Sequence, residues 1–314
     1  MRPAALCLLW LSLASCKPRD QAQAAGGTYR FAFVTNNTSA FWNIAVKGLK
    51  KAEQDFGIKA EPFRPLRGEL AEQQRFLEDI LVLGFDGVAI SPLNPESMTP
   101  LLDRVAARMP VITHDSDAPR AKRRAYVGTN NVLAGKAAGA AALAALGTRR
   151  TGKVALFVGR IDMQNAIERR QGIEEALKGS GLEILPVFLD NADRPRAKKN
   201  VEDALARYPD LALVMGIWSY NGPCLASALR ESARAEKPAA VAFDEDEETL
   251  KAVEDGVIYA TIVQKPFEFG YQSMRLLKEA KDGKPTPDTY DPGITTVTRQ
   301  NLNPFWTQLR ALLQ

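Results

Sequence analysis

The sequence is poor in the residues that most often build metal sites and nucleophilic active sites. Its 314 residues include a single histidine, His114. One imidazole leaves little material for a histidine-based metal site or a Ser-His-Asp triad, so we predict no metal site and no catalytic residue. We expect His114 to have a structural role or to lie at the rim of a site.

The chain also lacks a long hydrophobic run. Its most apolar stretch, residues 4–13, follows the positively charged Arg2 and is shorter than the roughly 20 residues that span a bilayer. This pattern indicates an export signal, which we place at residues 1–15. Its last residues and Cys16 read Leu-Ala-Ser-Cys, which resembles the bacterial lipobox and predicts lipidation of Cys16. A plain secretory signal with a cysteine there by chance is the alternative.

Cysteine is scarce, with three residues in the chain. Cys7 would leave with the signal and Cys16 would carry lipid, so Cys224 would be the only free thiol and no intramolecular disulfide could form. Cys224 lies in an apolar helical run, which favours a buried, unreactive thiol. Residues 16–27 are polar and lack periodicity, and we expect them to be a lipidated tether that holds a soluble body at a membrane surface.

Neither sign of charge dominates. The chain has 41 Lys and Arg against 37 Asp and Glu, for a formal net charge of +4. The densest basic cluster, Arg120, Lys122, Arg123 and Arg124, is interpreted as a solvated turn or a partner-facing patch, and we expect no nucleic-acid partner. The length suggests two domains, and the 46% of hydrophobic residues is typical of a globular protein.

From residue 28 onward, short apolar runs alternate with longer segments at helical spacing, which is typical of parallel sheets covered by helices. The predicted strands are Tyr29–Thr35, Lys59–Arg64, Gly87–Ile90, Val111–His114, Ala125–Gly128, Lys153–Val158, Glu183–Leu189, Ala212–Ile217, Ala239–Phe243 and Tyr259–Val263. Ten strands are too many for one comfortable open sheet. We therefore predict an α/β protein with two doubly wound parallel-sheet lobes of five or six strands each.

Polar and aromatic residues follow most of these strands. In open α/β sheets, ligands bind outside the carboxyl ends of the strands, so these residues form the candidate site. Amides, carboxylates, one guanidinium and aromatic rings suit a polyhydroxylated ligand, because they hydrogen-bond to hydroxyl groups and pack on C–H surfaces. Asn36 and Asn37 also follow a strand, but we rank them lower, as turn-forming residues.

Seven segments together resemble the type I periplasmic binding proteins of sugar ABC transporters, and within them the ribose-binding-protein-like group. The resemblance runs from residue 28 to about residue 304. The segments that carry it are Phe33–Asn37 through Phe41 and Trp42, Gly84–Pro92, Pro110–Asp115, Val127–Asn131 through Gly135, Asn165–Gly172 (N-A-x-x-R-x-x-G), Val241–Asp244 and Ala260–Pro266. Each segment alone is a weak signal, whereas seven in the family's order and spacing are a strong one.

The resemblance implies a ligand site with contributions from both lobes. Aromatic residues would grip a sugar, carboxylates would hold hydroxyl pairs, and an Asn and an Arg one helical turn apart would reach from the second lobe. The residues that match these roles, together with two from a turn of the second lobe, are Phe41, Trp42, Asp115, Asn165, Arg169, Trp218, Asn221, Asp244 and Gln264.

Structural alternatives stay open for several of these residues. Phe41 or Trp42 could pack in the core, although adjacent helix positions cannot both face it. Asp115 and Asn165 could cap a turn or a helix. Arg169 could pair with a glutamate on its own helix surface.

The sequence departs from the ribose binders in two places. Ser116 stands where they have an arginine after the aspartate, and the turn at residues 218–222 is longer and carries two extra aromatics. Both departures predict a sugar other than ribose, or a larger one. Asp244 opens the acidic run 244–248, which alone would indicate a helix start.

Enzymatic readings have little support in the sequence. A phosphate-loop-like stretch at 130–137 lacks its first glycine and its Ser or Thr, and no dinucleotide fingerprint or nucleophile elbow occurs, so we predict no cofactor. Asp115 and Asp244 could face each other as in a glycosidase, but their matched roles are hydrogen bonding from two lobes. Sugar-responsive repressors share these motifs, yet they begin with a DNA-binding helix-turn-helix, and this chain begins with an export signal.

The resemblance implies three crossings between the lobes, near residues 128–130, 264–266 and 291–295. We predict a first lobe of residues 28–129 plus 265–291 and a second of 130–264 plus 292–314. Closure on a monosaccharide or related polyol would be read by an ABC transporter permease, and we expect a lipid-anchored monomer in the periplasm or at the cell surface. A sugar sensor that signals to a membrane receptor or kinase is the alternative.

Overall fold

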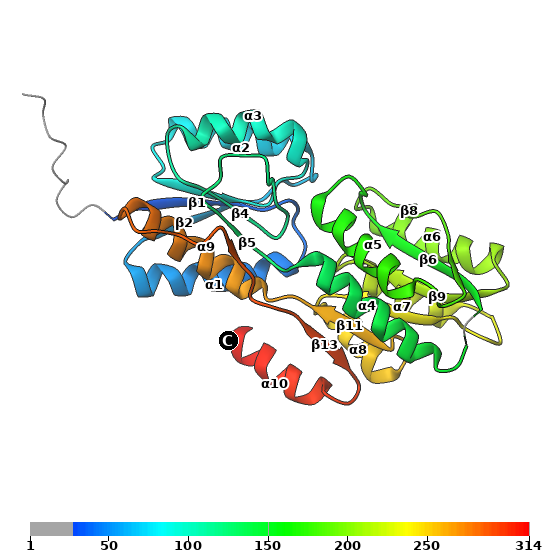
Figure 1. Ribbon diagram of the computed structural model, residues 1–314. Helices are drawn as coiled ribbons and strands as arrows, with labels where there is room; N and C mark the ends of the chain where they lie inside the picture. The colour runs from blue at the N-terminus through cyan, green and yellow to red at the C-terminus, as the bar shows by residue number, and fades with distance from the viewer. Residues whose placement is uncertain (1–27, 150, 314) are drawn as a thin grey trace, which may run out of the picture.

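The computed structural model describes residues 28–149 and 151–313. The predicted signal peptide (1–15), the lipidation at Cys16 and the tether (16–27) lie outside these residues. The described chain forms two α/β lobes, each built on one sheet (Figure 1). The predicted fold class, two parallel-sheet lobes, is confirmed.

The first lobe contains a six-stranded sheet in which every neighbouring pair is parallel. In spatial order its strands are β12 (Thr289–Tyr290), β5 (Ala125–Val127), β4 (Val111–His114), β3 (Gly87–Ile90), β1 (Arg30–Val34) and β2 (Lys59–Phe63). Helices α1 (Phe41–Phe56) and α9 (Pro266–Lys281) cover one face, and α2 (Leu70–Val82) and α3 (Pro95–Ala106) cover the other. Because both faces are covered, strands such as β3 are buried along their whole length.

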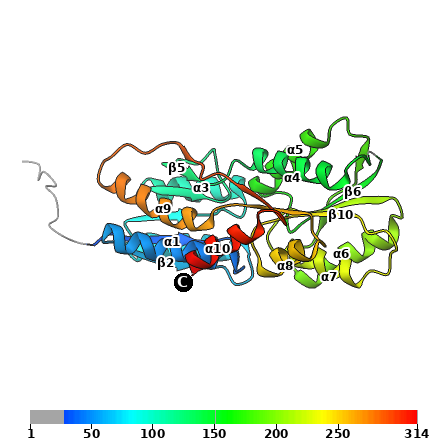
Figure 2. The same cartoon turned by 90° about the horizontal axis from the view of Figure 1, so that it is seen from below.

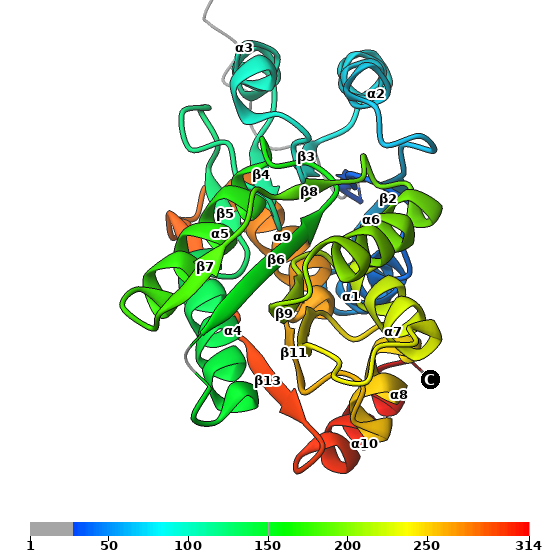
Figure 3. The ribbon, with the colours of Figure 1, turned by 90° about the vertical axis from the view of Figure 1, so that its right-hand side faces the viewer.

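The second lobe contains a seven-stranded sheet, seen in Figure 3. Its strands in spatial order are β13 (Thr295–Thr298), β11 (Ala260–Val263), β10 (Ala239–Phe243), β9 (Leu211–Gly216), β6 (Gly152–Val158) and β7 (Leu182–Ile184), with β8 (Phe188–Leu189) also beside β6. Its helices are α4 (Asn131–Leu146) and α5 (Gln164–Leu177) on one face, and α6 (Arg194–Arg207), α7 (Asn221–Glu231) and α8 (Glu247–Asp255) on the other.

The strand predictions differ from the structure in two regions. The single strand predicted at 183–189 is two short strands, β7 and β8. Pro186 lies between them, and a proline cannot donate a ladder hydrogen bond. Beyond residue 288 the sequence pattern missed β12, β13 and the helix α10 (Leu302–Leu313), and β13 pairs with β11 in the antiparallel direction.

The chain passes between the lobes three times, as Figure 2 shows. The passages lie between β5 and α4, between β11 and α9, and between β12 and β13. After the third passage, α10 turns back and packs against α1 of the first lobe. Leu309 of α10 and Ile44 of α1 belong to one apolar cluster that spans both lobes.

Glycine lets one helix pair approach closely in each lobe. A Cβ at Gly48 of α1 would lie 2.0 Å from the carbonyl oxygen of Phe267 of α9. In the second lobe, a Cβ at Gly172 of α5 would lie 2.1 Å from the carbonyl oxygen of Val132 of α4. Helix α5 carries the arginine predicted to reach the ligand, so this contact sets how closely that helix packs against α4.

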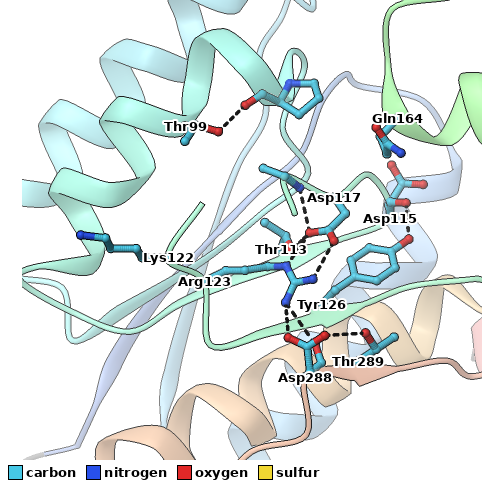
Figure 4. A network of polar contacts seen from close by, with 12 residues as sticks. Thr99, Thr113, Asp115, Asp117, Lys122, Arg123, Tyr126, Gln164, Asp288 and Thr289 are labelled. Atoms are coloured by element: carbon cyan, nitrogen blue, oxygen red, sulfur yellow. Dashed lines mark hydrogen bonds and ion pairs between the residues drawn. The ribbon is translucent and has the colours of Figure 1, made fainter. Parts of the chain in front are cut away.

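The basic cluster at 120–124 is not uniformly solvated, contrary to our interpretation. The Arg123 side chain is only 9% exposed, and its guanidinium bonds both oxygens of Asp117 at 2.7 and 2.8 Å. It also reaches Asp288 at 3.0 Å, which precedes β12 (Figure 4). Arg123 therefore ties the late strand β12 to the first lobe.

Candidate functional site

The carboxyl ends of the two sheets face each other across one cavity. Side chains from both lobes line it: Asn36, Asn37, Ser39, Phe41, Trp42 and Asp115 from the first, and Asn165, Arg169, Trp218, Ser219, Tyr220, Asp244 and Gln264 from the second. The space between them is about 360 Å³ and is partly open to solvent. Both lobes therefore lie close together around a space that suits a small ligand.

Asp115 projects from the end of β4 in a left-handed backbone conformation (φ 59°). Its N–H donates to the carbonyl oxygen of Val127 at 3.1 Å, and the Tyr126 hydroxyl donates to its carbonyl oxygen at 2.8 Å (Figure 4). A left-handed non-glycine residue is unfavourable on its own, and these bonds hold it in place. The carboxylate accepts from the Ser91 hydroxyl at 2.8 Å and from the Asn36 amide at 3.1 Å.

Burial raises the pKa of Asp115 to about 6, and the positive charge of Arg169 opposes that rise. The Ser91 hydrogen bond also favours the ionised form, whereas the nearby Asp244 carboxylate disfavours it. The side-chain amide of Asn165, on the opposite lobe, also favours the ionised form and lowers the pKa of Asp115. Asp115 is thus a carboxylate whose charge depends on contacts from both lobes.

Asp244 occupies the matching position at the end of β10 in the second lobe. It too is left-handed (φ 67°), and its N–H donates to the carbonyl oxygen of Ile262 at 2.9 Å. The Thr261 hydroxyl donates to its carbonyl oxygen at 2.7 Å, as Tyr126 does for Asp115. The Gln264 amide donates to its carboxylate at 3.0 Å. Burial raises the pKa of Asp244, again against the charge of Arg169.

The two aromatic residues at the start of α1 form one wall of the cavity. Phe41 and Trp42 pack edge to face with ring centroids 5.0 Å apart. The Trp42 indole N–H donates to the side-chain oxygens of Asn36 and Asn37 at 3.2 and 3.1 Å. The indole is therefore fixed by first-lobe amides and presents its ring to the cavity.

His114 lies outside the cavity lining and beneath this wall. Its ring stacks on Phe33 at 4.0 Å between centroids and meets Trp42 edge to face at 5.4 Å. Complete burial lowers the pKa of His114 to about 3. The imidazole is accordingly neutral and supports the aromatic wall.

Helix α5 brings Asn165 and Arg169 to the cavity on one face. Arg169 is 1% exposed, and its Nε and Nη1 donate to the Asn131 side chain at 3.0 Å and to the Ile217 carbonyl oxygen at 2.8 Å. Its guanidinium carbon lies 4.6 Å from the Phe243 ring centroid. The surface ion pair considered for Arg169 does not form.

The turn between β9 and α7 completes the second-lobe wall. Trp218, Ser219 and Tyr220 line the cavity, whereas Asn221 lies outside the lining. The Asn221 side-chain oxygen accepts the Trp218 backbone N–H at 3.1 Å. Asn221 therefore shapes the turn, and its neighbours face the cavity.

Five lining residues are not among the predicted ligand contacts: Asn36, Asn37, Ser39, Ser219 and Tyr220. Asn36 and Asn37, ranked lower as turn-forming residues, come at the end of β1, and that strand-end position was the signal for the cavity. The side chains of Ser219 and Tyr220 point into the cavity because of the geometry of an irregular turn. An irregular turn leaves no periodic signal in the sequence.

Four polar atoms of the lining side chains are buried without a hydrogen-bond partner in the described part of the chain. They are Asn165 Oδ1, Arg169 Nη2, Trp218 Nε1 and Gln264 Oε1, and all four belong to the second lobe. Buried polar groups are costly unless they are bonded, so such atoms mark where a ligand would be held. Two donors and two acceptors match the bonding capacity of hydroxyl groups.

Two further features bear on the ligand class. Arg169 is the only cation among the described lining residues, and it stands with two carboxylates, which does not favour an anionic ligand. Within residues 28–149 and 151–313, no group of three or more His, Cys, Asp or Glu side chains is arranged to hold a metal ion. No helix in the same residues has the length and hydrophobicity needed to cross a membrane.

Known proteins resemble this chain over most of its length. A family model described as a periplasmic binding protein domain matches residues 31–285. The D-allose-binding periplasmic protein of Escherichia coli is 24% identical over 80% of this chain and 84% of its own. The ribose import binding protein of Haemophilus influenzae is 28% identical over 74% and 78%.

Solved structures give the same result. An ABC transporter solute-binding protein from Burkholderia graminis, in complex with D-arabinose, is 30% identical with a TM-score of 0.83, covering 87% of this chain and 96% of that one. A glucose-galactose binding protein from Geobacillus stearothermophilus is 26% identical with a TM-score of 0.83, covering 88% and 99%. With its two lobes, its cavity and a family match over residues 31–285, this chain belongs to the type I periplasmic binding proteins and is similar to their ribose-binding group.

Proposed function

We propose that this protein is the substrate-binding component of an ABC transporter and closes on a monosaccharide or a related polyol. The observation that carries the proposal is the set of four unpartnered polar atoms on one wall of the cavity. Relatives that bind ribose, allose and arabinose according to their names and titles support the ligand class.

The proposed ligand would lie between the aromatic wall of α1 and the polar wall of the second lobe. Phe41 and Trp42 would pack on its C–H faces, and the carboxylates would accept from its hydroxyl groups. The proposed contacts are Phe41, Trp42, Asp115, Asn165, Arg169, Trp218, Asp244 and Gln264, with Asn221 holding the turn that carries Trp218. Ser116 is buried and does not line the cavity. At this position the protein therefore offers the ligand no guanidinium group, in contrast to the arginine of the ribose binders.

Closure of the lobes would be driven by the ligand's bonds to both walls. An open protein leaves the second-lobe atoms to water, and a closed protein without ligand buries them unpaired. A ligand that bonds them therefore stabilises the closed state more than the open one, which is the differential contact that closure needs. The three passages between the lobes would serve as the hinge.

Export, lipidation at Cys16 and delivery to a permease complete the proposal. The lobes would be residues 28–129 plus 265–291 and residues 130–264 plus 292–314. A diacylated Cys16 would keep a monomeric body near its membrane partner. A permease would then recognise the closed pair of lobes.

Thermal denaturation against a panel of pentoses, hexoses, deoxysugars, polyols and inositols tests the function. A ligand at 100 times its dissociation constant stabilises a protein by about 2.7 kcal/mol. We expect a clear rise in melting temperature with one compound or a small related group. No shift with any member of the panel, at concentrations up to tens of millimolar, would contradict a sugar or polyol ligand.

A further inference from the structure

A carboxylate outside the cavity holds the turn that carries two lining aromatics. Asp190 follows β8 and is fully buried. Its two oxygens accept from the Tyr220 hydroxyl and, at 3.1 Å, from the Asn221 amide. The Ala192 backbone N–H donates to it at 2.9 Å, through a turn in which Asn191 and Ala192 are both left-handed.

These bonds continue into the ligand site without a gap. Asn221, held by Asp190, accepts the backbone N–H of Trp218 at 3.1 Å. The residue before Trp218, Ile217, accepts a hydrogen bond from Arg169 at 2.8 Å. One buried network therefore connects Asp190 with the tryptophan and the arginine that carry unpartnered donors in the cavity.

The aromatic rings are also held from below. A Cβ at Gly159 would lie 2.3 Å from the Trp218 ring and 2.6 Å from the Tyr220 hydroxyl, so the Trp218 ring and the Tyr220 hydroxyl both lie directly against this backbone. Trp218 and Tyr220 pack edge to face, with centroids 6.3 Å apart. Tyr220 is thus placed by Asp190 and Gly159 at its hydroxyl and by Trp218 at its ring.

We propose that Asp190 is a positioning residue that sets ligand selectivity by aiming Tyr220 and the Trp218 indole N–H at one side of the bound sugar. The proposal rests on the sugar-binding function proposed above. Asp190 does not touch the ligand itself. It fixes the direction of a donor, and a fixed donor discriminates between a sugar and an analogue that lacks the oxygen opposite it.

Asp190→Asn is the direct test, because it keeps the size of the side chain and removes the charge that orders its partners. Tyr220→Phe removes the same hydrogen bond from the other end. We expect each variant to bind the preferred sugar about 10-fold more weakly or worse and to lose selectivity between that sugar and its deoxy analogues. The double variant should lose little more than either single one, because both remove one interaction.

Asp193→Asn is the matched control. Asp193 lies three residues away and caps α6 by accepting from the Arg196 N–H at 2.8 Å, a role that asparagine also fills. The sugar affinity and selectivity of the Asp193→Asn variant should equal those of the unaltered protein. If Asp190→Asn lowered the free energy of unfolding but left the selectivity ratio unchanged, Asp190 would be a purely structural residue and the proposal would be overturned.

The indole N–H resonance of Trp218, assigned with Trp218→Phe, separates this proposal from the proposed function. We expect Asp190→Asn to shift or broaden that resonance in the protein without sugar, with Trp306 unaffected. An unmoved Trp218 resonance would contradict the positioning role. If no sugar bound the unaltered protein, the proposed function would fail, and with it the selectivity part of the proposal.

Discussion

The two lobes use the same device to present a carboxylate, yet they leave it in different surroundings. Asp115 and Asp244 both follow a strand, both are left-handed, and a hydroxyl from the next strand fixes each carbonyl oxygen. In the first lobe, Ser91 and Asn36 bond the carboxylate, and the lining side chains bond one another. In the second lobe, four lining atoms have no partner in the described chain. The first lobe is therefore a prearranged platform, and the second holds the bonding capacity that a ligand would use.

The largest effect is expected from the second-lobe arginine. Arg169→Lys keeps the positive charge but loses the fork that bonds Asn131 and Ile217 and that would bond the proposed ligand. At about 1.5–3 kcal/mol for a charged hydrogen bond, we expect a loss of sugar affinity of roughly 10- to 150-fold by calorimetry. Arg170→Lys is the control, because Arg170 is half-buried, pairs with Glu174 and does not line the cavity. Equal affinities for the two variants would contradict the role assigned to the second lobe.

A smaller effect on sugar affinity is expected from the first-lobe carboxylate, Asp115. Its replacement should weaken sugar binding but stabilise the folded protein without sugar. Burial raises the pKa of Asp115 from 3.8 to about 6, so its ionised form destabilises the folded protein at pH 7, and protonation removes that penalty as the pH falls through 6 toward 4. Asp115→Asn should weaken sugar binding about 10-fold or more. Without sugar it should be more stable than the unaltered protein at pH 7, by on the order of 1–2 kcal/mol.

Chemical denaturation at several pH values checks this prediction. The stability advantage of Asp115→Asn should shrink between pH 7 and pH 4. An advantage that grows toward low pH would mean that Asp115 is a stabilising carboxylate in the folded protein.

Glycine substitutions test whether the two lobes share one packing device. Alanine usually favours a helix over glycine by about 1 kcal/mol. Gly172→Ala and Gly270→Ala should instead destabilise, by about 1–3 kcal/mol, because each new Cβ would lie 2.1 or 2.0 Å from a carbonyl oxygen of the facing helix. Urea denaturation measures the free energy of unfolding of both variants. A variant that is more stable than the unaltered protein would show that the two lobes do not share this packing device.

The smallest effect is expected in the reaction of the second-lobe thiol, Cys224, with thiol reagents. Burial raises the pKa of Cys224 to about 11, so little thiolate is present at neutral pH. A thiol reagent should modify Cys224 only when the second lobe opens locally or unfolds, and a bound sugar should slow the reaction further. Peptide mapping by mass spectrometry locates the modification, and rapid labelling of the folded protein would contradict this burial.

Most of the fold could be predicted, because apolar runs and helical spacing report on strands buried on both faces. The parts that escaped depend on contacts between distant residues. Arg123 is held by Asp117, six residues earlier, and also by Asp288, 165 residues later, and the second contact has no local signal. Helix α10 is amphipathic but comes after the last predicted strand, and its place against α1 follows from the third passage between the lobes.

The cavity was predictable wherever a residue directly follows a strand or repeats along a helix. Asp115 and Asp244 end strands, and Asn165 and Arg169 are one turn apart, so backbone periodicity alone brings them to the cavity. Within the turn before α7, Tyr220 lines the cavity while Asn221 lies behind it. That choice depends on the buried carboxylate of Asp190, which no local pattern connects to the turn.

A crystal structure with the sugar that gives the largest thermal shift would test the central claim most directly. We predict ligand oxygens within hydrogen-bond distance of Arg169 Nη2, Trp218 Nε1, Asn165 Oδ1 and Gln264 Oε1. The first-lobe bonds from Ser91 and Asn36 to Asp115 should be unchanged. A sugar bound through the first lobe alone, with the four second-lobe atoms still unpaired, would contradict the account.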